Sequence, residues 1–174
     1  NGWFDLHLKE LLNYKDLIIL FVKRNFTSQY KQTILGPAWA IIQPFVTTVI
    51  FTLVFGNIAG LAPSGVPTFL FYLSANIVWQ YFSGCLTTTS STFTANAAIL
   101  GKVYFPRLVM PISSVISQLI PFAIQLAFFL IFWVYYIVVP SGVEPNIYIF
   151  LFPLIIIQLA MLGLGFGVII SACT

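Results

Sequence analysis

The chain has 174 residues, of which 60% are hydrophobic and only 6% are charged, and its formal net charge is +3 at pH 7. A soluble domain carries roughly 25% charged residues, so this composition excludes an ordinary water-soluble fold and indicates an integral membrane protein. The isoelectric point near 9.0 reflects basic residues that flank apolar segments, so we expect no nucleic-acid partner.

Residues 1–32 hold most of the charged side chains and are predicted to form a cytoplasmic segment at the membrane surface. Apolar residues recur there at helical spacing, between charged and polar ones: Phe4, Leu8, Leu11 and Leu12. This pattern predicts an amphipathic helix that lies in the membrane interface. A second short helix is expected to begin near Asp16. The alternative is that this segment is a simple anchor.

Residues 33–174 are predicted to form the transmembrane domain. Since a helix rises about 1.5 Å per residue, about 20 residues cross the ~30 Å hydrocarbon core. Apolar stretches of sufficient length lie at about 37–58, 68–92, 109–139 and 147–171. The predicted fold class is therefore all-α, with an N-terminal interfacial helix and four transmembrane helices. Gly163 and Gly167, four residues apart in the last span, predict close packing against a neighbouring helix.

The basic residues indicate the orientation of these spans. All seven Lys and Arg residues precede the first span or lie between the second and the third. The loops at 59–67 and 140–146 contain no Lys or Arg. By the positive-inside rule, we expect a cytoplasmic N-terminus and a multi-pass protein of the cytoplasmic (inner) membrane.

None of the four predicted spans contains Asp, Glu, Lys, Arg or His. Proton-coupled carriers use such residues as relays inside the membrane, so their absence argues against a proton-driven carrier. The sequence has no GxxxxGK[ST] loop for nucleotide phosphates, and after Asp16 its only carboxylate is Glu144. We therefore expect that the chain is not an enzyme and binds no metal or cofactor, and that its energy source lies on another protein.

Two segments carry positive signals for function. Turn-forming, basic and aromatic residues lead into the first span: Tyr30, Lys31, Gly36, Pro37 and Trp39. They form a candidate cytoplasmic entrance, or alternatively an ordinary aromatic belt at the membrane boundary. The segment 96–111 carries Lys102 and Arg107 beside the aromatic pair Tyr104 and Phe105. It is either a short helix that docks onto a cytoplasmic partner or a plain loop whose charges only set the topology.

Four sequence blocks occur in order along the chain: RNFTSQYKQTILGPAW from Arg24, QP at Gln43 with FTLVFG from Phe51, NIVWQYF from Asn76, and KVYFPR from Lys102. Together they resemble the permeases of ABC-type polysaccharide exporters, which export O-antigen, capsule or teichoic-acid chains. The resemblance covers about residues 15–174. Such permeases have about six spans, so we expect this chain to be incomplete at its C-terminus.

The resemblance implies a homodimeric permease that works with two cytoplasmic ABC ATPase subunits, which would bind ATP and Mg. It implies an ATPase-coupling loop at Lys102, Tyr104, Phe105, Pro106 and Arg107. It implies a cytoplasmic gate at Arg24, Tyr30, Lys31, Gly36, Pro37 and Trp39. It also implies that the first two spans help line the channel, with the candidates Gln43, Phe51, Trp79, Gln80, Tyr81 and Phe82. For any single channel candidate, the alternative is that its side chain packs in the protein core or faces lipid.

The function expected from the sequence is export of lipid-linked polysaccharide across the cytoplasmic membrane by an ATP-driven permease. Aromatic side chains with polar, uncharged neighbours suit a glycan, because sugar rings stack on aromatic faces and hydrogen-bond to amides and hydroxyls. One alternative is a related ABC permease for drugs or lipids. Another is a non-transporting membrane anchor for a cytoplasmic partner. An uncharged aromatic wall encodes no particular sugar sequence.

Overall fold

The computed structural model describes residues 14–30, 36–61, 64–97, 106, 108–139 and 150–173. Within these residues the protein is helical and has no strand. Its α-helices are α2 (Lys15–Tyr30), α3 (Trp39–Phe51), α4 (Thr68–Ser90), α5 (Thr92–Ala95), α7 (Val109–Val138) and α8 (Phe152–Cys173). A 3-10 turn, η1 (Gly36–Ala38), precedes α3, and a π-helix, η2 (Thr52–Ile58), follows it. The amphipathic helix predicted near residues 4–12 lies outside the described residues.

Helices occupy each of the four segments that the sequence predicts to cross the membrane. Among the described residues, three helices are long and apolar enough to do so, at Trp39–Ile58, Val109–Val138 and Phe152–Cys173. The fourth, α4, has 23 residues but is less apolar, since it contains Asn76 and Gln80 and ends in a run of Thr and Ser. The all-helical membrane fold is therefore confirmed at the level of three candidate spans, and the crossing by α4 stays a prediction.

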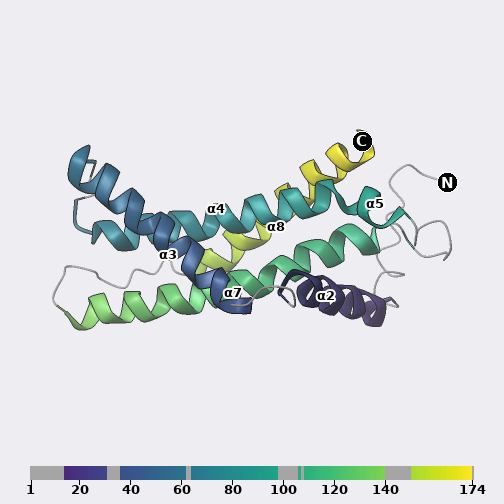
Figure 1. Ribbon diagram of the computed structural model, residues 1–174, viewed down its shortest axis with the longest axis horizontal. Coiled ribbons are helices and arrows are strands. Elements are labelled where there is room, and N and C mark those ends of the chain that lie inside the picture. The colour runs from purple at the N-terminus through teal and green to yellow at the C-terminus, as the bar shows by residue number, and fades with distance from the viewer. Residues whose placement is uncertain are drawn as a thin grey trace.

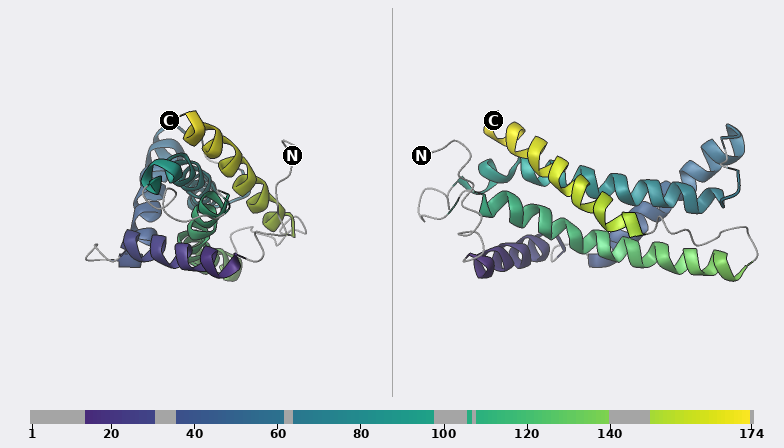
Figure 2. Two further views of the ribbon diagram at one scale, coloured as in Figure 1. Left: turned by 90° about the vertical axis from the view of Figure 1, so that its right-hand side faces the viewer. Right: turned by 180° about the vertical axis from the view of Figure 1, so that it is seen from behind.

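The helices form an elongated bundle in which α4 is central (Figure 1). It packs against α8, α7 and α3, whereas α2 packs against α7. The start of α7 and the ends of α5 and α8 lie together at one end of the bundle, and α2 lies nearby across α7 (Figure 2). The turn from η2 into α4 and the last residues of α7 lie at the opposite end. Successive long helices therefore run in opposite directions, as expected for helices that cross a membrane in turn.

The core of the bundle is a stripe along α4. Leu73, Ile77, Tyr81 and Cys85 are buried at intervals of four residues, which places them on one helix face, where Val115 and Phe122 of α7 pack against them. A smaller apolar cluster joins Phe21 of α2 to Val109 and Met110 at the start of α7. The first cluster fixes α4 on α7, and the second fixes α2 on the cytoplasmic end predicted for the bundle.

Two glycines of α8 allow it to approach α4 closely. A Cβ atom on Gly163 would lie 2.7 Å from the Cβ of Cys85, and one on Gly167 would lie 2.5 Å from the Cβ of Thr89. A Cβ on Gly165 would meet nothing within 4 Å. The predicted packing role of Gly163 and Gly167 is thus confirmed, and it is the small-xxx-small contact common between membrane helices.

We expect Gly167→Ala to destabilise the protein, because the added methyl group would force α8 away from Thr89. Overpacking of this kind typically costs about 1–3 kcal/mol. Gly165→Ala is the matched control, since it adds the same atom in open space and removes a helix-weakening glycine. The measurement is the fraction of folded protein left after heating in detergent. Equal losses for the two variants would contradict the close α4–α8 contact.

Candidate functional site

A polar groove runs between α3 and α4 on the side away from the apolar stripe. Its volume is about 420 Å³, and it is lined by Gln43, Thr47, Phe51, Asn76, Trp79, Gln80 and Ser83. The three residues from α3 are four apart in sequence, and those from α4 recur at intervals of three and four, so each helix contributes one continuous face. Trp79 is 65% exposed, which leaves its indole ring available to a ligand or a partner.

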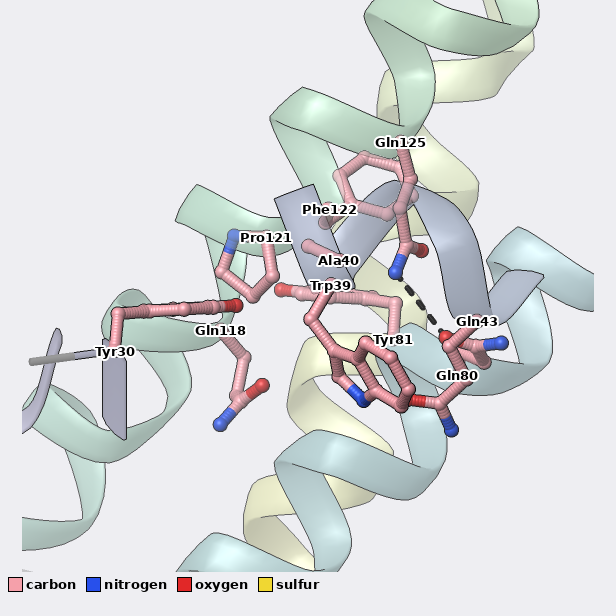
Figure 3. Close-up of a pocket in the computed structure, with 10 residues that line it drawn as sticks. All are labelled: Tyr30, Trp39, Ala40, Gln43, Gln80, Tyr81, Gln118, Pro121, Phe122 and Gln125. Carbon is pink, nitrogen blue, oxygen red and sulfur yellow. Dashed lines mark hydrogen bonds between the residues drawn. The ribbon is translucent and has the colours of Figure 1, made fainter. Parts of the chain in front are cut away.

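A second space, a cavity of about 170 Å³, lies where the end of α2 meets α3, α4 and α7. It is lined by Tyr30, Trp39, Ala40, Gln43, Gln80, Tyr81, Gln118, Pro121, Phe122 and Gln125 (Figure 3). Gln43 and Gln80 line both the groove and the cavity, so the two spaces adjoin at this pair of amides. We refer to these spaces as the groove and the cavity.

A ladder of neutral hydrogen bonds crosses from α7 through α4 to α3. Gln125 Nε2 donates to Gln80 Oε1 at 3.1 Å, as Figure 3 shows, and Gln80 Nε2 donates to Asn76 Oδ1 at 3.4 Å. Asn76 Nδ2 in turn donates to the carbonyl oxygen of Pro44 at 3.1 Å and to Thr48 Oγ1 at 3.3 Å. Each of these polar groups would be costly in hydrocarbon, and the ladder gives them partners within the protein.

Helix α3 departs from regular geometry where it borders the groove. Pro44 lies inside the helix, and its carbonyl oxygen accepts hydrogen bonds from both Asn76 and the hydroxyl of Thr48, the latter at 2.6 Å. Thr52, the first residue of the π-helix η2, bonds through its hydroxyl to the carbonyl oxygen of Thr48 at 2.8 Å. Side chains from α4 and from α3 itself therefore stabilise a segment that a proline would otherwise weaken.

Tyr81 places a buried hydroxyl at the cavity. Its side chain is only 3% exposed, and its ring packs 4.8 Å from that of Phe122 between centres. The hydroxyl has no full hydrogen-bond partner among the described residues, because the nearby thiol of Cys85 is only a weak partner. Figure 3 shows this hydroxyl pointing across the cavity, toward the side on which Tyr30 lies. A buried hydroxyl without a partner costs about 1–3 kcal/mol.

The predicted entrance residues separate into two places. Arg24 Nη2 donates to Asn96 Oδ1 at 2.6 Å, and its guanidinium carbon lies 4.8 Å from the centre of the Phe21 ring. Arg24 thus joins α2 to the end of α5 and does not line the cavity. Tyr30 and Trp39 do line it, and burial raises the pKa of the Tyr30 phenol above its ordinary value.

The remaining entrance and coupling residues are described only in part. Gly36 opens the turn η1 with a φ of +47°, a left-handed conformation that favours glycine. The carbonyl oxygen of Pro106 accepts the backbone N–H of Val109 at 3.0 Å at the start of α7. The structure does not describe the side chains of the other predicted residues, namely Lys31, Pro37, Lys102, Tyr104, Phe105 and Arg107. Their roles stay predictions.

The structure brings most of the predicted channel residues together. Gln43, Phe51, Trp79 and Gln80 line the groove, and Tyr81 lines the cavity. Phe82 lines neither space, and its ring pairs instead with that of Trp79 at 6.0 Å between centres. Sequence reasoning missed Asn76, Gln118 and Gln125. The signal for the last two was present, because they are the only two amide side chains of α7 and, being seven residues apart, lie on one face of that helix.

The sequence profile of the ABC-2 type transporter family matches residues 16–174. The chain belongs to this family. Two relatives from Klebsiella pneumoniae, each named O-antigen export system permease protein RfbA, are 26% and 27% identical over 90% and 95% of the chain. A protein of the same name from Myxococcus xanthus is 26% identical over 95% of the chain. The ABC-2 type chain spans 58%, 62% and 61% of the lengths of these three curated relatives.

We expect Arg24→Ala to loosen α2 in this ABC-2 type protein, because it removes the bond to Asn96. A hydrogen bond of this kind contributes about 1 kcal/mol net, so backbone amides of α2 should exchange hydrogen several-fold faster. Hydrogen exchange followed by mass spectrometry in nanodiscs measures this. Lys23→Ala is the control, since Lys23 is an exposed neighbouring cation. Identical exchange in the two variants would show that the Arg24–Asn96 bond does not hold α2.

Proposed function

We propose that this chain is part of the permease subunit of an ATP-driven exporter that moves lipid-linked polysaccharide across the cytoplasmic membrane. The observation that carries this proposal is the groove, a continuous polar and aromatic surface on helices of a membrane bundle. Membership of the ABC-2 type transporter family supports it, as do relatives named for O-antigen export. In this view the chain supplies the path for the substrate and a separate protein supplies the energy.

In this proposal α4 is the fourth membrane span. At about 1.5 Å per residue its 23 residues reach about 35 Å, enough to cross the ~30 Å hydrocarbon core. Asn76 and Thr89 are buried between α4 and its neighbouring helices, which keeps them from lipid. The proposal assigns the N-terminal side to the cytoplasm, because α2, which carries basic residues, and the start of α7 lie toward the same end of the bundle (Figure 1).

The groove supports a homodimer. Gln43 presents an exposed amide in the groove, and hydrocarbon cannot hydrogen-bond to it, so a lipid-facing groove would be costly. A second copy of the subunit, with its own groove turned inward, would enclose a water-filled path and keep this amide from lipid. The exposed Trp79 ring would then lie along the path, where a sugar ring can stack on it.

The lining chemistry favours a glycan over a drug or a lipid. The described residues that line the groove and the cavity include no charged side chain. Amides and hydroxyls offer both donors and acceptors, which match sugar hydroxyls, whereas an apolar substrate would leave them without partners. The alternatives of a drug or lipid permease and of a non-transporting anchor make different predictions for variants of the groove.

The energy source in this proposal is a cytoplasmic ABC ATPase that binds ATP and Mg. The expected contact is the segment with Lys102, Tyr104, Phe105, Pro106 and Arg107. This segment joins α5 to α7, and both flanks lie at the end of the bundle assigned to the cytoplasm (Figure 2). Basic and aromatic residues there would meet a complementary cleft of the ATPase.

Deleting the gene should abolish surface polysaccharide, and complementation with Trp79→Ala should restore only part of it. We expect roughly 2- to 10-fold lower export, as for the loss of one aromatic stacking contact. Phe71→Ala is the control, since it removes an exposed aromatic from the same helix outside the groove. Export is measured as polysaccharide at the cell surface. If deletion leaves surface polysaccharide intact, the proposal fails. Full export by Trp79→Ala would argue for an anchor.

Replacing Lys102 and Arg107 together by Glu should weaken ATPase binding about tenfold or more, because the substitutions reverse the charge of the expected docking segment. Co-purification of the ATPase subunit and polysaccharide export should fall together. The charge-matched control is the double reversal of Lys15 and Lys23 to Glu, both of them exposed on α2. Unchanged co-purification in the double variant would exclude this segment as the main docking site.

A further inference from the structure

The cavity differs from the groove in being shaped by four separate helices. Amides and phenols surround it, at Tyr30, Gln43, Gln80, Tyr81, Gln118 and Gln125. The aromatic rings of Trp39 and Phe122 complete its wall, and none of its described lining residues is charged. It is therefore rich in neutral donors and acceptors, with flat aromatic surfaces beside them.

The Tyr81 hydroxyl indicates that the cavity takes a polar occupant. The side chain is almost fully buried, it lines the cavity, and its hydroxyl has no full hydrogen-bond partner among the described residues. Buried polar groups are normally satisfied by protein, by ligand or by ordered water. A polar occupant of the cavity would supply the missing partner.

The cavity is too large for one water molecule and unsuited to a lipid chain. Its volume of about 170 Å³ far exceeds the roughly 10–15 Å³ that accommodates one water. An acyl chain would leave the amides unpaired. A separate apolar cleft of about 300 Å³, lined by residues such as Ile77, Phe129 and Trp133, suits such a chain far better. A charged group would find no counter-charge among the described lining residues.

We propose that the cavity is a binding subsite for one neutral sugar residue of the exported glycan, entered from the groove past Gln43 and Gln80. This inference rests on the proposed function and adds a defined place where the chain is held. Amides of α4 and α7 bind the sugar hydroxyls, Tyr81 donates its hydroxyl, and Trp39 offers an aromatic face. Because Tyr30 closes the wall from α2, a shift of α2 would open or close the subsite.

The first test is photo-crosslinking in cells that carry the whole exporter. Tyr30 lines only the cavity and Trp79 only the groove. Tyr135, an exposed residue of α7, lines neither and is the control. Each is replaced in turn by p-benzoylphenylalanine. Ultraviolet light should then join the permease to the cell's own polysaccharide at positions 30 and 79, but not at 135. Adducts at 79 without adducts at 30 would overturn the subsite and leave the proposed function standing.

The second test is Tyr81→Phe, which removes one hydroxyl and keeps the ring. Because this hydroxyl has no full protein partner, the amount of folded permease and its ATPase binding should not fall. Export should fall about 2- to 10-fold, the effect of losing one neutral hydrogen bond to the substrate. Tyr72→Phe is the control, since that hydroxyl donates to the carbonyl oxygen of Leu61 at 3.1 Å, away from the cavity.

The outcomes separate the two proposals. Adducts at position 30 together with the Tyr81→Phe defect support the subsite. Normal export by Tyr81→Phe would mean that the cavity holds only water, and would overturn it. Surface polysaccharide that persists without the gene would instead remove the proposed function, and the subsite with it.

Discussion

Hydrocarbon offers no hydrogen-bond partner, so a polar side chain on a membrane helix must find one inside the protein or in an enclosed aqueous path. In this chain α4 meets that constraint by packing different faces against different helices. One face is an apolar stripe against α7 and α8, and its last residue, Cys85, meets a glycine of α8, as does Thr89 one turn later. Another face carries Asn76 and Gln80 into the amide ladder with α3 and α7. The central helix α4 is less apolar than α3, α7 and α8, and it packs against all three, which give several of its polar side chains partners or cover them.

The same constraint explains why the candidate site lies where it does. The amide ladder ends at the carbonyl oxygen of Pro44, inside α3. The groove and the cavity open on the two sides of the Gln43–Gln80 pair. A site of neutral amides and aromatic rings recognises hydroxyl groups without requiring a counter-ion. It can also release them, since each contact is weak alone.

Helix α2 connects this site to the end of the bundle where energy is expected to enter. Phe21 packs on the first residues of α7, and Arg24 bonds to Asn96 just after α5. Both flanks of the segment that joins α5 to α7 are thus in contact with one helix. The last residue of that helix, Tyr30, lines the cavity. If the segment between α5 and α7 moves, its contacts with α2 therefore carry that movement to Tyr30 in the cavity wall.

The sequence by itself determined the membrane environment, the positions of the long helices and the small-residue contact, because apolar length, turn residues and the Gly163–Gly167 spacing are local properties. It also selected Gln43, Trp79 and Gln80, which lie near one another on the neighbouring helices α3 and α4. Only the tertiary structure showed the hydrogen bonds between helices: Gln125 to Gln80, Asn76 to Pro44, and Arg24 to Asn96. It also showed that Phe82 does not line the groove and packs against Trp79. Those contacts depend on how the helices cross and rotate against one another, and that geometry is set by packing between segments far apart in the chain.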